Sequence, residues 1–568
     1  MYGSPKEKTL SEEVKKKITG KECRFVTYVE PQEYGRPDLH FVKEVTHYDD
    51  GTSEPTINLI YDFKRPFWVT NKAARDYKQP KEWIDKNRVT EYKSTQSKLM
   101  ENACRALQEP WFRGAMRKLQ ENPYLFGTDI KSTAIVKKAY QDRYKGTKET
   151  LFSTMMLDIE TDVLHGTEET IMLTIYFGNL CITGVVKSFV EKYHDVQGRV
   201  EAAMKKYLGE YVDKYNIESS LFIYEDEIDL LRSMFAKVHE LRPDFCAIWN
   251  LDFEITKFIA ACERANVDPK DIFSDPAVPP EYRYFMYKRG SSQKVTASGK
   301  ITPIPPQARW HTVICTASFY FMDAMCAFKH VRVGKPERAR YGLDAILGEE
   351  LKLGKLKFEE ANAYERLKWH VFMQENYKIE YIIYNRFDCI GMQLLEDKNK
   401  DMSLFVPLYS ATSDFEDFKS QPRRTSDQLH WEVLEKGKVM GTTSKALVDK
   451  YSDQTYTMDG WISNLAASLI TPQGLKIIAE DPNLETTVYV AVGDLDVSAS
   501  YPNGEVVYNI SKETTSKEIM WIEGIPEEVY QTQNMLLTTG HVDAVEWCTN
   551  MLGFPKLTDV LQHFDTNQ

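Results

Sequence analysis

The sequence predicts an α/β protein, with a mixed α+β part at the N-terminus and further strands towards the C-terminus. The main observation is that apolar β-runs alternate with helical patterns between residues 151 and 400, as in a sheet domain with connecting helices. The composition agrees with this class, because 42% of the 568 residues are hydrophobic and 27% are charged. At roughly 100–200 residues per domain, a chain of this length holds about three to five compact units.

Residues 1–150 form the first predicted unit, a mixed α+β domain. Short β-like runs occur at residues 25–31, 57–63 and 66–71. A strongly helical stretch follows from about Glu91 to Glu121, and Pro110 should end or kink it. The apolar residues that set its helical period are Leu99, Ala103, Leu107 and Trp111.

The middle unit, residues 151–400, alternates strands and helices. Its β-runs lie at residues 153–160, 170–177 and 180–190, and its clearest helical patterns at 225–240 and 255–265. We expect residues 401–485 to be a polar, helical connection that packs on the N-terminal domain. A new β-run opens the last unit, residues 486–568.

Charge, cysteine content and hydropathy exclude several classes of protein. With 84 acidic and 72 basic residues the net charge is −12, so a nucleic-acid partner would need a locally basic groove. The nine cysteines are scattered and include no CxxC pair, which argues against a disulfide framework or a zinc ribbon. The most apolar stretch, residues 171–186, is interrupted by Gly178-Asn179 and predicts two strands rather than a membrane span. We expect a soluble, cytoplasmic protein without a membrane partner.

The first of three acidic segments in the middle unit ends an apolar β-run. Strand alternation puts Asp158 and Glu160 on the same face of this strand. Two carboxylates in such a setting repel each other unless a cation lies between them. Taken alone, the segment is explained equally well as a strand end whose acids face solvent.

The other two segments place polar side chains on predicted helices. Asn250 follows a β-run and can cap the next helix, with Glu254 on the same side four residues later. Tyr384 and Asp388 are i, i+4 neighbours on a later helix. Taken alone, the first of these segments is also explained as an ordinary capped helix start, and the second as a Tyr/Asp pair on the surface. Together, the three segments supply the oxygen ligands with which two Mg²⁺ ions support in-line displacement at phosphorus.

This order of residues resembles the three motifs of DEDDy 3′→5′ proofreading exonucleases. The matching stretches are Asp158-Ile-Glu160, Asn250-x-x-Phe253-Glu254 and Tyr384-x-x-x-Asp388. The resemblance implies an RNase H-like exonuclease domain with two Mg²⁺ ions, for which Mn²⁺ can substitute. It also implies the role of each residue. Asp158 would bridge the ions, Glu160 and Asp388 would complete the shell of one, Glu254 would help hold the other, and Tyr384 would align the attacking water.

The second motif departs from the family. Glu254 stands where the family has Asp, and the usual N-x-x-x-F-D spacing is one residue longer than the spacing here. An extra methylene moves a carboxylate by about 1.5 Å, which is enough to slow chemistry that depends on positioning. Asp252 is an alternative ligand, although its side chain should point away from the face that carries Asn250 and Glu254.

Residues 493–502 (GDLDVSASYP) are similar to motif A of family-B DNA polymerases, D-x-x-S-L-Y-P. Residues 509–514 (NISKET) resemble the NISPET stretch of phage enzymes in that family. The resemblance implies a partial polymerase palm with a Mg²⁺-binding aspartate, a carbonyl ligand and two nucleotide contacts. These residues are Asp496, Val497, Ser498 and Tyr501.

No counterpart of motif C or of the basic fingers helix follows residue 502. We therefore expect the N-terminal subunit of a split replicative polymerase of the tailed-phage type, in the host cytoplasm if a phage encodes it. Its expected partners are primer-template DNA, single-stranded 3′ ends, a sliding clamp, and a second chain that supplies fingers, motif C and thumb. Two alternatives stay open: a stand-alone exonuclease, and a DNA-binding scaffold whose exonuclease has decayed.

Local groups must supply DNA contacts because the whole chain is acidic. The resemblance places Asn250 and Phe253 beside the DNA. Lys294 and Arg309 belong to a basic, proline-containing stretch, residues 288–309, which we expect to be an exposed loop or hairpin. This stretch is a candidate for separating primer from template, and a solvated loop without such a role is an equal alternative.

Overall fold

The computed structural model describes residues 16–441, apart from residues 32, 34, 76–82, 110–115, 148, 296–298, 355 and 357, and four short strands beyond them. The chain divides into two compact units, Met1–Thr457 and Met458–Gln568. This division falls inside the segment predicted as a connection, residues 401–485. In the second unit, β19 (Leu475–Ile478) pairs antiparallel with β20 (Glu485–Val488), and β21 (Leu537–Thr538) pairs with β22 (His541–Val542). β19 is therefore a strand where the sequence pattern predicts helix.

Two small antiparallel sheets form the core of the N-terminal part. The first contains β1 (Ile18–Val29), β2 (Leu39–Tyr48) and β3 (Ser53–Tyr61) in that order. In the second, β4 (Arg65–Thr70) lies between β6 (Val89–Ser94) and β7 (Leu125–Phe126). The predicted β-runs at 25–31, 57–63 and 66–71 therefore correspond to β1, β3 and β4.

The helix predicted from about Glu91 to Glu121 is only partly present. Residues 89–94 form β6, because this segment pairs with β4 along its whole length. The first helix, α1, begins at Leu99 and ends at Leu107, where Gln108 adopts a left-handed conformation. Two further helices follow, α2 (Met116–Leu119) and α3 (Ser132–Arg143). The helical period is correct for Leu99, Ala103 and Leu107, which are all buried.

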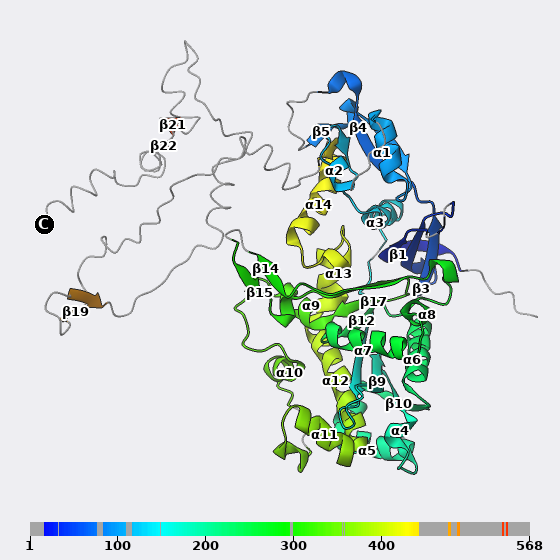
Figure 1. The fold of residues 1–568 in the computed structure, drawn as a ribbon, viewed down its shortest axis with the longest axis vertical. Coiled ribbons are helices and arrows are strands. Elements are labelled where there is room, and N and C mark those ends of the chain that lie inside the picture. Colours follow the sequence, from blue (N-terminus) through cyan, green and yellow to red (C-terminus); the bar gives the residue numbers. More distant parts are fainter. Residues whose placement is uncertain are drawn as a thin grey trace, which may run out of the picture. The chain divides into compact units, whose positions relative to one another are not determined.

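A six-stranded mixed sheet forms the centre of the middle unit, which confirms the α/β fold class (Figure 1). Its strand order is β11-β10-β9-β8-β12-β17. β8, β9 and β10 are antiparallel to their neighbours among these three, whereas β12 is parallel to both β8 and β17. The bounds are β8 (Thr154–Thr161), β9 (Thr170–Phe177), β10 (Leu180–Val186), β11 (Glu218–Tyr224), β12 (Phe245–Ile248) and β17 (Tyr320–Asp323). The predicted turn at Gly178-Asn179 joins β9 to β10, and Gly178 has a φ of +63° there.

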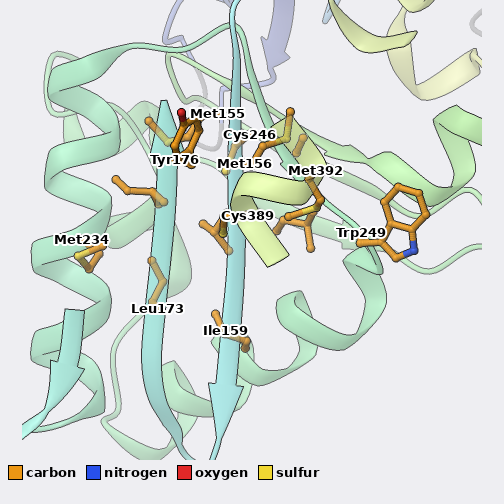
Figure 2. Close-up of a cluster of buried hydrophobic side chains, with 14 of the residues drawn as sticks. Met155, Met156, Ile159, Leu173, Tyr176, Met234, Cys246, Trp249, Cys389 and Met392 are labelled. Carbon is orange, nitrogen blue, oxygen red and sulfur yellow. The ribbon is translucent and has the colours of Figure 1, made fainter. Parts of the chain in front are cut away.

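Helices cover this sheet and bury an apolar core. α12 packs on β8, β9 and α5, whereas α6 packs on β9 and β10. The helices are α4 (Lys187–Val190), α5 (Val196–Tyr215), α6 (Glu227–Leu241), α7 (Leu251–Arg264), α8 (Pro269–Phe273), α9 (Ala324–Val331), α10 (Leu343–Leu351), α11 (Leu367–Asn376) and α12 (Lys378–Asn399). Figure 2 shows side chains from the strands and from α12 in this core, among them Met155, Met156, Leu173, Cys246, Cys389 and Met392. The predicted helices at 225–240 and 255–265 correspond to α6 and α7.

The basic stretch 288–309 forms a β-hairpin that extends from two paired strands outside the mixed sheet. β13 (Phe285–Lys288) pairs with β16 (Thr312–Cys315), and between them β14 (Gln293–Val295) pairs with β15 (Ile301–Pro303). Gly290 lies so close to the carbonyl of Arg309 that a Cβ atom would meet that oxygen at 2.2 Å. Only glycine fits at this point of the hairpin base.

Residues 401–440 extend from α12 back to the N-terminal sheets. They contain a π-helical turn (Asp401–Phe405), α13 (Val406–Tyr409), α14 (Gln421–Glu435) and β18 (Lys438–Met440). β18 pairs with β5 (Trp83–Asp85), and Trp431 of α14 packs on Ile130 and Ala134. Among the helices that the structure describes, none has the length and apolar character needed to cross a membrane.

Candidate active site

The first two acids of the candidate site lie side by side on the face of β8 that α12 covers. β8 is an interior strand of the sheet, where Asp158 pairs with Thr174 and Glu160 with Met172 of β9. Asn385 of α12 donates a hydrogen bond from Nδ2 to Oδ2 of Asp158, at 2.6 Å. The hydroxyl of Tyr381, also in α12, donates to Oε2 of Glu160.

One face of α12 supplies most of the remaining groups. Positions 381, 384, 385 and 388 are separated by three or four residues, so they share a helix face. Tyr384 and Asp388 are 9% and 8% exposed. The Tyr384 ring packs edge-on against Trp369 with a centroid distance of 4.8 Å and stacks parallel to Tyr381. These contacts fix the direction in which the Tyr384 hydroxyl points.

The third element is α7, which begins directly after β12. Asn250 holds the predicted N-cap position, but its side chain makes no capping hydrogen bond and is exposed. Glu254, one turn later, is buried at 5% exposure, and its Oε2 atom has no hydrogen-bond partner within the described structure. Phe253, the residue before it, is 42% exposed. α7 therefore directs one acid inwards and leaves one aromatic ring at the surface.

Burial and mutual repulsion shift the pKa values of these acids. Burial raises the pKa of Glu254 well above its usual value, and the neighbouring charges of Asp158, Asp323 and Glu160 add to this effect. Burial and the charge of Glu160 raise the pKa of Asp158 in the same way. Burial, followed by the field of Asp388, holds the pKa of the Tyr384 phenol far above its usual range. The phenol therefore stays protonated and can donate a hydrogen bond at neutral pH.

The four carboxyl groups fit a hard divalent cation in chemistry. Carboxylate oxygens are the ligands that Mg²⁺ and Mn²⁺ prefer. A buried carboxylate oxygen without a partner, as in Glu254, is unfavourable unless a positive charge compensates it. The residues that could hold ions are Asp158, Glu160, Glu254 and Asp388.

The carboxylate oxygens of these four acids lie farther apart than the ligand atoms around a single ion. In the described part of the chain, one group brings three acidic ligand atoms within 4.8 Å of one another: Asp414, Glu416 and Asp417. Lys131 already places a positive charge in that group, since its Nζ lies 2.8 Å from Asp417 and also contacts Glu416. A cavity of about 260 Å³ adjoins the group between β1, α3 and residues 413–416, away from the predicted catalytic residues. We therefore do not regard the Asp414 group as the metal centre.

The helix geometry predicted that Asp252 points away from Glu254, and the structure agrees, so Asp252 does not replace Glu254 at the site. Its Oδ1 atom accepts hydrogen bonds from the Tyr287 hydroxyl at 2.5 Å and from Nε of Arg289 at 2.8 Å. Tyr287 also contacts Nδ1 of His311 at 3.0 Å. Asp252 thus ties α7 to the base of the hairpin rather than to the acids.

The other two predicted DNA contacts, Lys294 and Arg309, differ in exposure and in hydrogen bonding. Lys294 is exposed on β14 of the hairpin. Arg309 is half-buried and donates from Nε to the carbonyl of Ile304 at 2.7 Å, which closes the hairpin base. The predicted palm residues, Asp496, Val497, Ser498 and Tyr501, lie outside the described residues.

Three residues at the site were not singled out as site residues from the sequence. Tyr381 and Asn385 precede Asp388 by seven and three positions, a spacing that puts them on its helix face and could have identified them. Asp323 ends β17 beside β12, and its Oδ1 accepts from the backbone N–H of Cys326 at 2.9 Å. Burial raises the pKa of Asp323 to about 7. Its charge acts on Glu254 only because parallel strands β12 and β17 end together.

The comparisons with known proteins leave the family of this chain open. None of the protein-family models matches the sequence, and no curated protein is similar to it.

Proposed function

We propose that the middle unit is a metal-dependent 3′→5′ DNA exonuclease of the DEDDy type. The observation that carries this proposal is the convergence of β8, α7 and α12. β8 and α12 meet across more than 220 residues of chain, because Tyr381 donates to Glu160 and Asn385 to Asp158. α7 brings Glu254 into the field of Asp158 and Glu160. The strand order supports the proposal too, because a mixed sheet of antiparallel and parallel strands agrees with the RNase H-like expectation.

The chain's own residues would divide the work as follows. Bound Mg²⁺ or Mn²⁺ would activate water and stabilise the leaving oxygen. The protonated Tyr384 phenol, fixed by its contact with Trp369, would hold the attacking water by a hydrogen bond. Asp388, one turn further along α12, would bind an ion beside it. The acids would remain poorly compensated, and the site inactive, without the ions.

A single-stranded 3′ end is the substrate that the surroundings favour. Phe253 is exposed next to Glu254, and an exposed aromatic ring offers a stacking surface to any base. Lys257 lies over this ring with its Nζ 5.4 Å from the centroid, where it supports the ring, while its charge is paired with Glu168 at 2.6 Å. The hairpin carries further exposed cations, among them Lys288 and Lys294.

The test is digestion of single-stranded DNA carrying a 5′ label by the full chain in Mg²⁺ or Mn²⁺. We expect shortening from the 3′ end, and a loss of at least about 10³-fold in rate for Asp158→Ala combined with Glu160→Ala. The matched control is Glu416→Ala combined with Asp417→Ala, which removes two acids from the Asp414 group and should leave the rate unchanged.

Two outcomes would redirect the proposal. Unchanged digestion by the Asp158/Glu160 variant, with loss in the Glu416/Asp417 variant, would move the active site to the Asp414 group. DNA binding without digestion in either ion would favour the alternative of a scaffold with a decayed exonuclease. The wider expectation, a family-B polymerase completed by a second chain and a sliding clamp, stays a prediction.

A further inference from the structure

The two acids of β8 share a feature that Glu254 lacks. Each accepts a hydrogen bond from an uncharged side chain of α12: Asp158 from the amide of Asn385, and Glu160 from the phenol of Tyr381. Glu254 instead keeps a buried oxygen without a partner in the described structure. The donors are four residues apart and the acids two, so one helix face matches one strand face.

Tyr381 is itself held from two sides. Nδ1 of His370 lies 2.8 Å from its hydroxyl oxygen, and Nε2 of Gln374 donates to the same oxygen at 3.4 Å. Tyr381 is fully buried, so water does not compete for its hydroxyl, which donates to Oε2 of Glu160.

Gln374 extends this support to the backbone that follows β8. Its Nε2 donates to the carbonyl of Thr161 at 2.7 Å, and its Oε1 accepts from the N–H groups of Val163 and Leu164 at 3.1 Å. The side chain is 1% exposed. Gln374 therefore binds the end of β8 to α11 and at the same time orients Tyr381 of α12. Three elements fix the position from which the phenol reaches Glu160.

We infer that Tyr381 and Asn385 are positioning residues that set the orientation of the Glu160 and Asp158 carboxylates for cation binding. The inference rests on the proposed function and extends it to residues outside the three motifs. Donors that hold metal-binding carboxylates fix their rotamers and raise the affinity of the site, and their removal typically weakens metal binding about 10–100-fold. Neither residue touches the substrate or the ion in this role.

The experiment compares Tyr381→Phe with Tyr377→Phe in the full chain. The first removes only the hydroxyl that contacts Glu160. The second removes a hydroxyl one turn earlier, which donates at 2.8 Å to the surface acid Glu360. Isothermal titration with Mn²⁺, without DNA, measures the affinity directly. We expect an affinity about 10–100-fold weaker for Tyr381→Phe and an unchanged affinity for Tyr377→Phe.

Kinetics provide a second measurement. Raising Mn²⁺ should restore most of the exonuclease kcat of Tyr381→Phe, with the KM for DNA unchanged, because only the occupancy of the ion site is impaired. Asn385→Ala should weaken Mn²⁺ binding in the same range through Asp158, and it serves as an independent test if Tyr381→Phe does not fold. Wild-type Mn²⁺ affinity in both variants, or tighter binding, would overturn the inference.

The result also separates this inference from the proposed function. If the wild-type chain binds Mn²⁺ and digests DNA but the two variants behave like it, only the positioning role fails. If the wild-type chain does not bind Mn²⁺, or if Asp158→Ala with Glu160→Ala leaves binding intact, both the inference and the proposed site are wrong.

Discussion

At the junction between the N-terminal sheet and the mixed sheet, buried acids are paired with buried cations, whereas at the candidate active site buried acids face one another. Arg24, 2% exposed, lies 3.1 Å from Glu22 and 3.5 Å from Asp244. Lys43 of β2 is fully buried, and its Nζ donates at 2.8 Å to the carbonyls of Arg242 and Ser318. In the described structure, by contrast, the charges that act on Asp158 and Glu254 are all negative.

The difference separates a polar cluster that the fold itself compensates from one that it leaves uncompensated. A buried charge is tolerated when opposite charges and hydrogen bonds compensate it within the fold, as at the junction. The acids of the candidate site receive two hydrogen bonds from α12, and Nδ1 of His370 lies 3.7 Å from Glu160. Among the described residues, no cationic side chain is among the charges that act on Asp158 or Glu254. Perturbed pKa values of this kind cluster at functional sites, where an ion or substrate supplies the missing charge.

The largest effect on stability should come from the junction. Lys43→Met leaves Asp244 without an ammonium at 3.7 Å and leaves three backbone carbonyls without their donor. Removing one partner of such a buried set costs about 3–5 kcal/mol. Urea unfolding of the full chain at pH 7 measures this loss. Lys16→Met, which removes an exposed partner of Asp50, is the control and should leave the unfolding curve unchanged. Equal effects of the two changes would contradict the comparison.

The second prediction concerns metal binding, because a bound cation would supply the positive charge that the acids of the candidate site lack. Mn²⁺ at about 100 times its dissociation constant should stabilise the folded chain by about 2.7 kcal/mol relative to EDTA. Thermal unfolding detects this as a higher Tm. Asp158→Asn with Glu160→Gln should abolish the rise, because the ligands are lost. Lys43→Met should keep it, because the junction takes no part in binding. A rise that survives in the Asp158/Glu160 variant would place the ion elsewhere.

The smallest effect tests the unpartnered acid. Glu254 has a folded-state pKa raised above its usual value, so its charge opposes folding as pH rises from about 4.5 towards that raised pKa. Glu254→Gln should therefore stabilise the metal-free chain at pH 8, by less than the two changes above, and should make little difference well below pH 4.5. Unfolding in EDTA at the two pH values measures this. Glu263→Gln, an exposed acid on the same helix, is the control. A stabilisation that does not change with pH would show that the pKa of Glu254 is not raised in the folded chain.

Much of the middle unit could be predicted from the sequence because its local signals agree with one another. Gly178-Asn179 divides an apolar run into β9 and β10, and the apolar alternation places Asp158 and Glu160 on one strand face. The helical spacing of Tyr384 and Asp388 likewise places both on one face of α12. Periodicity gave a wrong answer between residues 91 and 98, because the pairing of β6 with β4 is a long-range contact that overrides local helical preference.

The site was less predictable than the elements that carry it. Nothing local indicates that Asn385 meets Asp158, since the two are 227 residues apart in the chain. The exposure of Asn250 and the bonding of Asp252 to the hairpin also depend on how α7 leaves β12. Asp323 acts on the site only through its position beside β12, which no local pattern indicates.

The sequence by itself determined the α/β class, the two strands around Gly178 and the faces on which the acids of β8 and the groups of α12 lie. Those features follow from strand alternation and helical period, which act over a few residues. Tertiary structure alone decided that α12 crosses β8 so that Tyr381 and Asn385 reach the acids, and that Glu254 is buried among negative charges. Burial and electrostatic coupling depend on which elements pack together, and packing joins residues that no local pattern connects.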